Sequence, residues 1–555
     1  MRTTLPAVIF VVLAVSSAAA EWNVWTVTET RRVLRDDPPA AAKAVSIAAA
    51  RNEWESFQIL VRSAEPVAGV RVEPADLVGN NGAVLPAASA RLYRQHQFLL
   101  DQSTYRNDAF KPGWYPDGLI PFLHPVTGKP LSGRLRAVPF DLPAGQTHGF
   151  WVDLYVPPGT PAGVYRGAYR VTAADGRKAE VPVELTVWNF ELPATPTLQT
   201  ALGSPAARLR GYYRKQADKA KPPADWAEVD AQCYALAAEH RINADPTFDL
   251  SPKPRSDGSF EVPGETVAAL RGFIDRYHVN AVPIAHPSRA IKDPEQDREK
   301  LRAWLAAWDA AIRALDRPGV VLYVYLKDEP NDPDEYRYVQ QWGRAIRQFK
   351  PAIKLLVVEQ TKTQDPKWGD LYGAVDIWCP LFSLHDAETA AARRALGETV
   401  WTYTALCQGN KTPWWHTDFP LLHYRVPGPL AWRHDMQGLL YWGGMSFWDQ
   451  VDDPWSDPKT LDRRNQGKGL LYNGEGSLVY PARAVGYEGI APSLRLKALR
   501  DGIEDFEYLA MLQRAGHGDQ ARRIIAPLAV SWFQWAEDPA AWAAARKQLA
   551  AAIVP

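Results

Sequence analysis

Two adjacent carboxylates stand just after a short apolar run in the second half of the chain. The run VVLYVYL (320–326) is rich in β-branched and aromatic residues, and Lys327 separates it from Asp328 and Glu329. Such a run is typical of a buried strand, so both acids are expected at the strand's carboxyl end. Two neighbouring carboxyl groups can divide acid and base roles, because their proximity pushes their pKa values apart. Asp328 and Glu329 are therefore the predicted catalytic residues.

The same pair also has a structural interpretation. Acidic side chains at the start of a helix complement its dipole and cap its first turn, and the segment after Pro330 has a helical pattern. Asp332 and Asp334 already fulfil that role, which leaves Asp328 and Glu329 nearer to the strand end. We therefore favour the catalytic interpretation.

Helical stretches alternate with short apolar runs over residues 198–491. The helical stretches are 225–241, 265–278, 295–316 and 334–350, and the apolar runs are 280–285, 320–326, 353–358, 375–380, 398–406 and 438–444. This alternation predicts parallel strands with crossover helices, and no glycine-rich phosphate loop accompanies it. We predict a (β/α)8 TIM-type barrel, in which the active site lies where strands end and the following loops begin.

Other strand ends and loops of this barrel supply residues that could bind a substrate. They are Glu359, Tyr403, His416, Trp442 and Trp448, with Asp449 as a further acid. Each has an ordinary alternative: Glu359 as an ion-pair partner at the barrel rim, Tyr403 and the tryptophans as core residues, and His416 as a structural loop residue. No set of ligands close enough for a metal site is present, so we predict neither a metal nor a cofactor.

The chain before the barrel has the alternation of an antiparallel β-protein. Apolar residues recur at every second position from Glu21 to about Pro193, and Asp175-Gly176 favours a tight hairpin turn. We predict a multidomain protein with an N-terminal β-sandwich at 21–193. A Pro-rich linker, 191–198, precedes the barrel, and a helical, Ala-rich segment at 492–555 is expected to pack on the barrel. The shortness of this linker predicts a docked sandwich.

The amino-acid composition limits the classes of partner that the protein could bind. The 555 residues include 63 basic and 63 acidic side chains, so the formal charge is zero and no net field attracts nucleic acid. The 22 Trp and 22 Tyr residues supply flat apolar faces that suit core packing and sugar stacking alike. The three cysteines are widely spaced and form no disulfide framework. No feature specifies an oligomeric state.

The N-terminus has the pattern of an export signal. Residues 1–20 combine one Arg near the start, an apolar run at 7–15 and three alanines at 18–20. The apolar run is too short to cross a bilayer, and no later stretch approaches the length of about 18 apolar residues that a membrane helix needs. We expect a secreted or periplasmic protein without a membrane span; a signal anchor is the alternative.

Three long segments resemble the catalytic domain of glycoside hydrolase family 123. They are KDEP at 327–330, the stretch 398–448 from ETVWTYTAL to GGMSFW, and the stretch 470–512 that begins LLYNGEGSLVYP. In addition, GWYPDGLIP at 113–121 and VPPGTPAGVYRG at 156–167 are similar to the β-sandwich that precedes that domain. The resemblance covers nearly the whole chain after the export signal.

The resemblance implies a retaining, exo-acting β-N-acetylgalactosaminidase or β-N-acetylhexosaminidase. In such enzymes the 2-acetamido oxygen of the substrate attacks the anomeric carbon, an exception to the usual use of two carboxylates. On the matching positions, Glu329 would be the general acid/base and Asp328 would hold the acetamido N–H. Tyr403 is expected to bind the acetamido oxygen, and Trp442 and Trp448 to form apolar walls. The carbohydrate would be a glycan or a glycoconjugate.

Two alternatives remain at this stage. The protein could hydrolyse another sugar by a conventional mechanism, in which Glu329 would pair with Glu359 or Asp449 across the site. It could also be a non-catalytic carbohydrate-binding surface protein that uses the sandwich and the Trp-rich barrel mouth. The intact Asp328-Glu329 pair counts against the second alternative, since a binding protein has no need of two neighbouring acids at a strand end.

Overall fold

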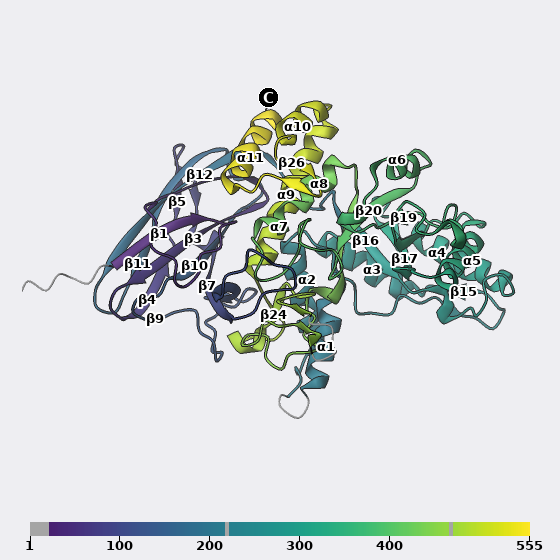
Figure 1. The fold of residues 1–555 in the computed structure, drawn as a ribbon, viewed down its shortest axis with the longest axis horizontal. Helices are drawn as coiled ribbons and strands as arrows, with labels where there is room; N and C mark the ends of the chain where they lie inside the picture. The colour runs from purple at the N-terminus through teal and green to yellow at the C-terminus, as the bar shows by residue number, and fades with distance from the viewer. Residues whose placement is uncertain (1–21, 217–220, 465–469, 555) are drawn as a thin grey trace, which may run out of the picture.

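The computed structural model describes residues 22–216, 221–464 and 470–554. The predicted export signal at 1–20 lies outside these residues. Figure 1 shows a β-sandwich on the left, a parallel barrel with its helices on the right, and the C-terminal helices between them. The predicted fold class is confirmed.

The N-terminal part consists of two sheets. The first has the order β1 (Trp22–Thr28), β3 (Glu53–Ser63), β10 (His148–Val156), β7 (Ala90–Leu100) and β8 (Gly113–Pro121). The second has the order β2 (Val45–Arg51), β12 (Lys178–Glu191), β11 (Gly163–Thr172), β4 (Val67–Glu73) and β9 (Phe140–Leu142), with β5 (Leu77–Gly79) and β6 (Val84–Leu85) alongside. Strands β11 and β12 pair antiparallel around Asp175-Gly176, as the turn dipeptide predicts.

Strand β10 has two buried faces of different character. Phe150, Val152 and Leu154 point into the apolar core between the two sheets. On the opposite face, Trp151 packs with the barrel core and Asp153 is a fully buried carboxylate. The alternation of this strand is therefore the expected one, but its outer face contacts protein rather than solvent.

The barrel is built on a seven-stranded sheet in which every neighbouring pair is parallel. Its order is β13 (Gln199–Ala201), β21 (Gly438–Tyr441), β20 (Thr399–Thr404), β19 (Ile377–Trp378), β18 (Lys354–Val358), β17 (Val321–Asp328) and β16 (Ala281–Ile284). The helices are α1 (Pro205–Lys215), α2 (Trp226–Glu239), α3 (Gly264–Tyr277), α4 (Arg298–Leu315), α5 (Pro333–Arg347), α6 (Ala387–Ala395), α7 (Leu422–Arg425) and α8 (Pro427–Arg433). Four two-stranded antiparallel sheets pair β14 (Lys253–Pro254) with β15 (Phe260–Glu261), β22 (Leu461–Asp462) with β23 (Leu471–Tyr472), β24 (Val479–Pro481) with β25 (Ile490–Pro492), and β26 (Ala529–Ser531) with β27 (Gln534–Trp535).

The barrel is nearly closed, and side chains rather than a strand ladder close it. Between β13 and β16 lies the segment 242–245, in the place of the second strand of an eight-stranded barrel. The Asn243 side chain donates to Thr200 O at 3.0 Å and to Asn280 Oδ1 at 2.8 Å, and its backbone N–H donates to Thr200 Oγ1 at 2.8 Å. The eighth position therefore differs from a regular strand, because amide side chains replace part of its backbone pairing.

The C-terminal helix α9 (Leu494–Arg514) connects the barrel to the sandwich, and α10 (Gly518–Ile525) and α11 (Pro539–Ile553) follow it. Figure 1 shows α9 between the sandwich and the barrel. Its charged side chains are buried against partners from the sandwich: Arg500 and Lys497 contact Asp153 at 3.0 and 2.5 Å. Leaving such a buried charge unpaired costs about 3–5 kcal/mol. The sandwich is thus docked through ion pairs as well as apolar contacts.

Candidate active site

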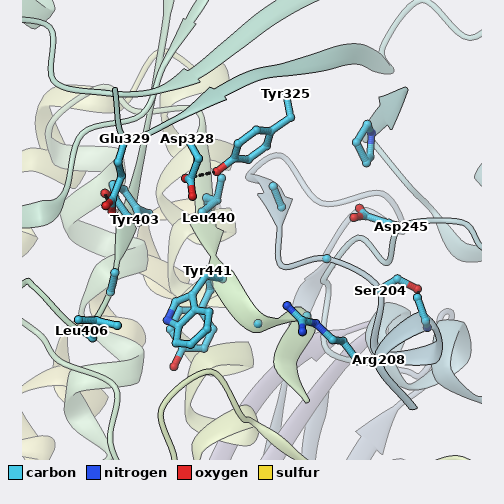
Figure 2. A pocket seen from close by; sticks show the side chains of 18 of the residues that line it. Ser204, Arg208, Asp245, Tyr325, Asp328, Glu329, Tyr403, Leu406, Leu440 and Tyr441 are labelled. Atoms are coloured by element: carbon cyan, nitrogen blue, oxygen red, sulfur yellow. Dashed lines mark hydrogen bonds between the residues drawn. The ribbon is translucent and has the colours of Figure 1, made fainter. Parts of the chain in front are cut away.

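A pocket of about 700 Å³ opens at the carboxyl ends of the barrel strands. Its volume falls within the usual range of small-molecule sites, about 300–1,000 Å³. Figure 2 shows Asp328, Glu329 and Tyr403 on one side of the view and Asp245 and Arg208 on the other. The polar side chains that line it are Ser204, Arg208, Asp245, Tyr323, Tyr325, Asp328, Glu329, Tyr403, Cys407, Tyr441, Trp442 and Arg463.

Asp328 is the last residue of β17 and is held by a tyrosine of the same strand. The Tyr325 hydroxyl donates to Asp328 Oδ1 at 2.7 Å. Residues three apart on a regular strand point to opposite faces, but the pairing of β17 with β18 is irregular between Tyr325 and Lys327. This irregularity brings both Tyr325 and Asp328 to the pocket.

Glu329 follows with a strained backbone and a tyrosine partner from another strand. Its φ of 38° is in the left-handed region that non-glycine residues rarely adopt. Its backbone N–H donates to Val358 O at 3.1 Å, and Asn331 Nδ2 donates to its carbonyl at 2.7 Å. The Tyr403 hydroxyl, from β20, donates to Glu329 Oε1. This backbone turns the Glu329 side chain toward the same pocket as Asp328.

Both tyrosine hydroxyls are fixed as donors. Burial raises the pKa of Tyr403, and the negative charge of Glu329 raises it further. Burial likewise raises the pKa of Tyr325, with a further contribution from Asp328. Since both phenols keep their protons, each carboxyl group has one hydrogen-bond donor that restricts its orientation.

The helix-capping role belongs to Asp332 and not to the pair before it. Asp332 is the N-cap of α5, and its Oδ1 accepts from the N–H groups of Asp334 and Glu335 at 2.9 Å each. Asp328 and Glu329 instead contact the tyrosines that line the pocket.

Trp442, immediately after β21, lines the pocket, as its position in the sequence suggests. It begins a short 3-10 turn, Trp442–Met445, in which Gly443 and Gly444 have φ values of 83° and 65°. A Cβ on Gly443 would lie 2.7 Å from Gly476 O, so only glycine fits this close approach. The indole Nε1 donates to Glu475 behind the wall.

Three other residues that were predicted to contact the substrate, Glu359, His416 and Trp448, do not line the pocket. Glu359 is buried beside Tyr336, and burial raises the pKa of its carboxyl group to about 7, with a smaller contribution from the charge of Glu329. His416 is fully buried, with Nδ1 3.2 Å from Glu475 Oε2. Trp448 is 1% exposed and packs edge-on against Tyr212. The sequence pattern predicts that these residues lie near the barrel mouth. It does not predict which loop side chains point into the cavity.

Asp245 is a pocket residue that the sequence reasoning missed. It ends the irregular segment 242–245, and burial raises the pKa of its carboxyl group to about 7. Among the described residues, no hydrogen bond or ion pair to this carboxyl group occurs. The only sequence signal was an acid just before Pro246, without the apolar run that marks the other strand ends.

In the part of the chain that the structure describes, no cluster of three or more His, Cys, Asp or Glu side chains could hold a metal ion. Within the same residues, no helix combines the length and the apolar character that a membrane crossing requires.

Two family models match the chain. The model of the glycoside hydrolase 123 catalytic domain matches residues 298–512, and that of the glycoside hydrolase 123 N-terminal domain matches residues 25–173. The first match contains Asp328, Glu329, Tyr403 and Trp442, and the second contains most of the sandwich. No curated protein matches the chain.

Among solved structures, a family 123 glycoside hydrolase from Clostridium perfringens, described in a study of glycolipid glycan hydrolysis, is similar over 96% of both chains. The TM-score is 0.65 and the sequence identity 13%, so this likeness concerns the fold. A family 39 glycoside hydrolase from Bacteroides cellulosilyticus WH2 matches with a TM-score of 0.32 and 9% identity over 85% of this chain and 82% of its own.

Proposed function

Since the chain belongs to glycoside hydrolase family 123, we propose that it is a retaining, exo-acting β-N-acetylgalactosaminidase or β-N-acetylhexosaminidase that uses the 2-acetamido group of its substrate. The substrate would be a glycan or glycoconjugate with a terminal β-linked N-acetylhexosamine. Export to the periplasm or the medium, based on the sequence of residues 1–20, belongs to this proposal.

One observation carries the proposal: two adjacent carboxylates at one strand end face the same pocket, each held by its own tyrosine. Conventional glycosidases place their two carboxyl groups on opposite sides of the scissile bond, ~5–5.5 Å apart for retention and ~6.5–9.5 Å apart for inversion. Two consecutive residues at one strand end suit different roles: one carboxyl group reaches the leaving oxygen, and the other reaches the 2-substituent of the sugar.

In the first step, the acetamido oxygen forms a bond to the anomeric carbon while the bond to the leaving oxygen breaks. Glu329 donates a proton to that oxygen, which leaves as an alcohol. Asp328 accepts a hydrogen bond from the acetamido N–H and stabilises the positive charge that develops on the resulting oxazolinium ring. Tyr325 keeps Asp328 in the required orientation.

In the second step, water attacks the anomeric carbon from the face that the alcohol has left, and the carboxylate of Glu329 takes its proton. The ring opens to restore the acetamido group, and two inversions give net retention. Tyr403 donates to Glu329 in the structure, and its proposed contact with the acetamido oxygen would require the hydroxyl to exchange this partner. Trp442 offers the apolar wall that a sugar ring packs against.

Asp245 fits the role of an acceptor for sugar hydroxyl groups. It lines the pocket on the side opposite Glu329 in Figure 2 and has no partner of its own among the described residues. A carboxylate without a partner in such a position gains most when a ligand hydroxyl donates to it.

We expect Asp245→Asn to lower kcat/KM by roughly 10- to 100-fold, mostly through KM, because hydrogen bonds to charged groups contribute about 1.5–3 kcal/mol. Steady-state kinetics of the purified variant measure this. Asp275→Asn, a surface change in the pair Asp275–Arg317, is the matched control and should leave both constants as they are. Unchanged KM in Asp245→Asn would remove Asp245 from the binding site.

A panel of nitrophenyl glycosides tests the proposed function. Hydrolysis of β-N-acetylhexosaminides, and of the galacto isomer above all, is the expected outcome. Hydrolysis of other sugars alone would favour the conventional mechanism. Binding without hydrolysis of any member would favour the non-catalytic alternative.

A further inference from the structure

The wall residue Trp442 is held from behind by a buried carboxyl group. Its indole Nε1 donates to Oε1 of Glu475, which is 1% exposed. The other carboxyl oxygen, Oε2, lies 3.2 Å from Nδ1 of the fully buried His416. A change in the orientation of Trp442 would break this hydrogen bond to a buried acceptor, which is unfavourable.

A glycine on each side fixes the turn that carries Glu475. Gly474 and Gly476 have φ values of 77° and 67°. A Cβ on Gly474 would lie 2.2 Å from Thr417 Oγ1, and one on Gly476 would lie 2.8 Å from the Cβ of Phe447. The backbone N–H of Gly476 donates to the Tyr441 hydroxyl at 2.7 Å. The turn therefore has little freedom to shift relative to the pocket wall.

An arginine of α9 ties this turn to the sandwich. Arg495 Nη1 donates to Gly474 O at 2.9 Å, and its Nε and Nη2 contact Asp117, on strand β8, at 2.9 Å. Asp117 and Arg495 are 0% and 1% exposed. The Tyr480 hydroxyl also donates to Asp117 at 2.5 Å. A charged pair so completely buried has few alternative arrangements.

A second set of contacts from the sandwich reaches the same turn. Between β7 and β8, Thr104 Oγ1 accepts from the backbone N–H of Asn473 at 3.0 Å. The carbonyl of Gln102 accepts from the Asn473 side chain at 3.0 Å. The residue immediately before Gly474 is thus bound to the sandwich as well.

We infer that Glu475 is a positioning residue for Trp442, and that Asp117 of the sandwich acts on the pocket wall through Arg495 and the turn at 474–476. The inference rests on the proposed function, in which Trp442 packs against the sugar. It makes the N-terminal sandwich part of the substrate-binding unit, and explains physically why a catalytic barrel would carry this domain.

The protonation state of Glu475 indicates which substitutions can distinguish a role in positioning Trp442 from a role in proton transfer. Burial raises its pKa to about 8, so the carboxyl group is protonated at neutral pH, and burial lowers the pKa of His416, which stays neutral. Glutamine has the same shape, keeps an acceptor for Trp442 and carries no titratable proton. Leucine has a similar size but offers no acceptor.

Glu475→Leu should therefore lower kcat/KM by about 10²-fold, the size of loss expected when a wall of the site is misplaced by about an ångström. Most of the loss should lie in KM, and Glu475→Gln should recover most of it. Loss of activity in Glu475→Gln equal to that in Glu475→Leu would overturn the positioning role, since it would point to proton transfer. Wild-type kinetics in Glu475→Leu would also overturn it.

The link to the sandwich is tested by Asp117→Asn with Asp153→Asn as the matched control. Both substitutions remove the charge of a buried sandwich carboxylate that pairs with α9, so both should lower the melting temperature. Asp117→Asn alone should also raise KM, by roughly tenfold, because only it is connected to the turn beside Trp442. Equal KM values in the two variants would refute the connection.

A readout that does not depend on activity keeps this inference separate from the proposed function. The protein is labelled with 5-fluorotryptophan, and the ¹⁹F resonance of position 442 is assigned as the one missing in Trp442→Phe. We expect this resonance to move in Glu475→Leu and Asp117→Asn, and to stay in place in Asp153→Asn. An unmoved resonance in the first two variants would contradict the inference even if the enzyme is active. A moved resonance in a protein without glycosidase activity would support the positioning contacts while the proposed function fails.

Discussion

Glu329→Gln should lower kcat/KM for natural glycosides by roughly 10²–10⁴, the usual contribution of a positioned proton donor. The amide cannot protonate the leaving oxygen, but it can still accept from the Tyr403 hydroxyl, so the fold and the pocket should be retained. A substrate with an acidic leaving group, such as a dinitrophenyl glycoside, needs little protonation and should lose far less. Kinetics on both kinds of substrate measure the effect.

Glu335→Gln is the matched control for this variant. Glu335 lies six residues further along, in the first turn of α5, and pairs with Lys327 at 2.6 Å near the surface. Its substitution should leave kcat/KM within the experimental error. Equal losses on good and poor leaving groups in Glu329→Gln would remove Glu329 from the role of general acid.

Asp328→Asn should have the second-largest effect, a loss of about 10²–10³ in kcat, because an oriented charge at the developing oxazolinium ring would disappear. Binding of a thiazoline, which mimics that ring, should weaken in parallel, since a site complementary to the transition state binds its analogues far more tightly than substrate. Turnover and the inhibition constant of the thiazoline are the two measurements.

The control for Asp328 is a true helix cap in the same segment. Asp332→Ala removes the side chain that accepts from two N–H groups of α5, and should cost about 1 kcal/mol of stability without affecting catalysis. If Asp328→Asn behaves like Asp332→Ala, with a small loss of stability and full activity, Asp328 has no part in the reaction.

The sequence predicted that Asp328 and Glu329 stand at a strand end, and the structure brings both to the pocket. The run at 320–326 is apolar and ends at two acids, and a barrel places such an end at its open face. The same reasoning located Tyr403 and Trp442, which follow or end apolar runs of β20 and β21 and line the pocket.

The residues that the sequence did not reveal share a physical reason. Asp245 ends a segment that the amide of Asn243 holds in place in the barrel, so no apolar run precedes it in the sequence. Glu475 lies in a glycine-rich turn, and its function follows from a tertiary contact with Trp442. Arg495 and Arg500 of α9 have the composition of a solvated helix face, and only the sandwich carboxylates Asp117 and Asp153 explain their burial.

The most direct test of substrate-assisted catalysis compares two nitrophenyl β-galactosides that differ only at carbon 2, one with an acetamido group and one with a hydroxyl group. We expect the wild-type protein to hydrolyse the first and to leave the second intact, because in the proposed mechanism the acetamido oxygen is the nucleophile and Asp328 orients it. The corresponding thiazoline should inhibit hydrolysis competitively. Efficient hydrolysis of the 2-hydroxy substrate without inhibition by the thiazoline would contradict the mechanism, and would point to a second carboxylate that lines the pocket, such as Asp245, as the partner of Glu329.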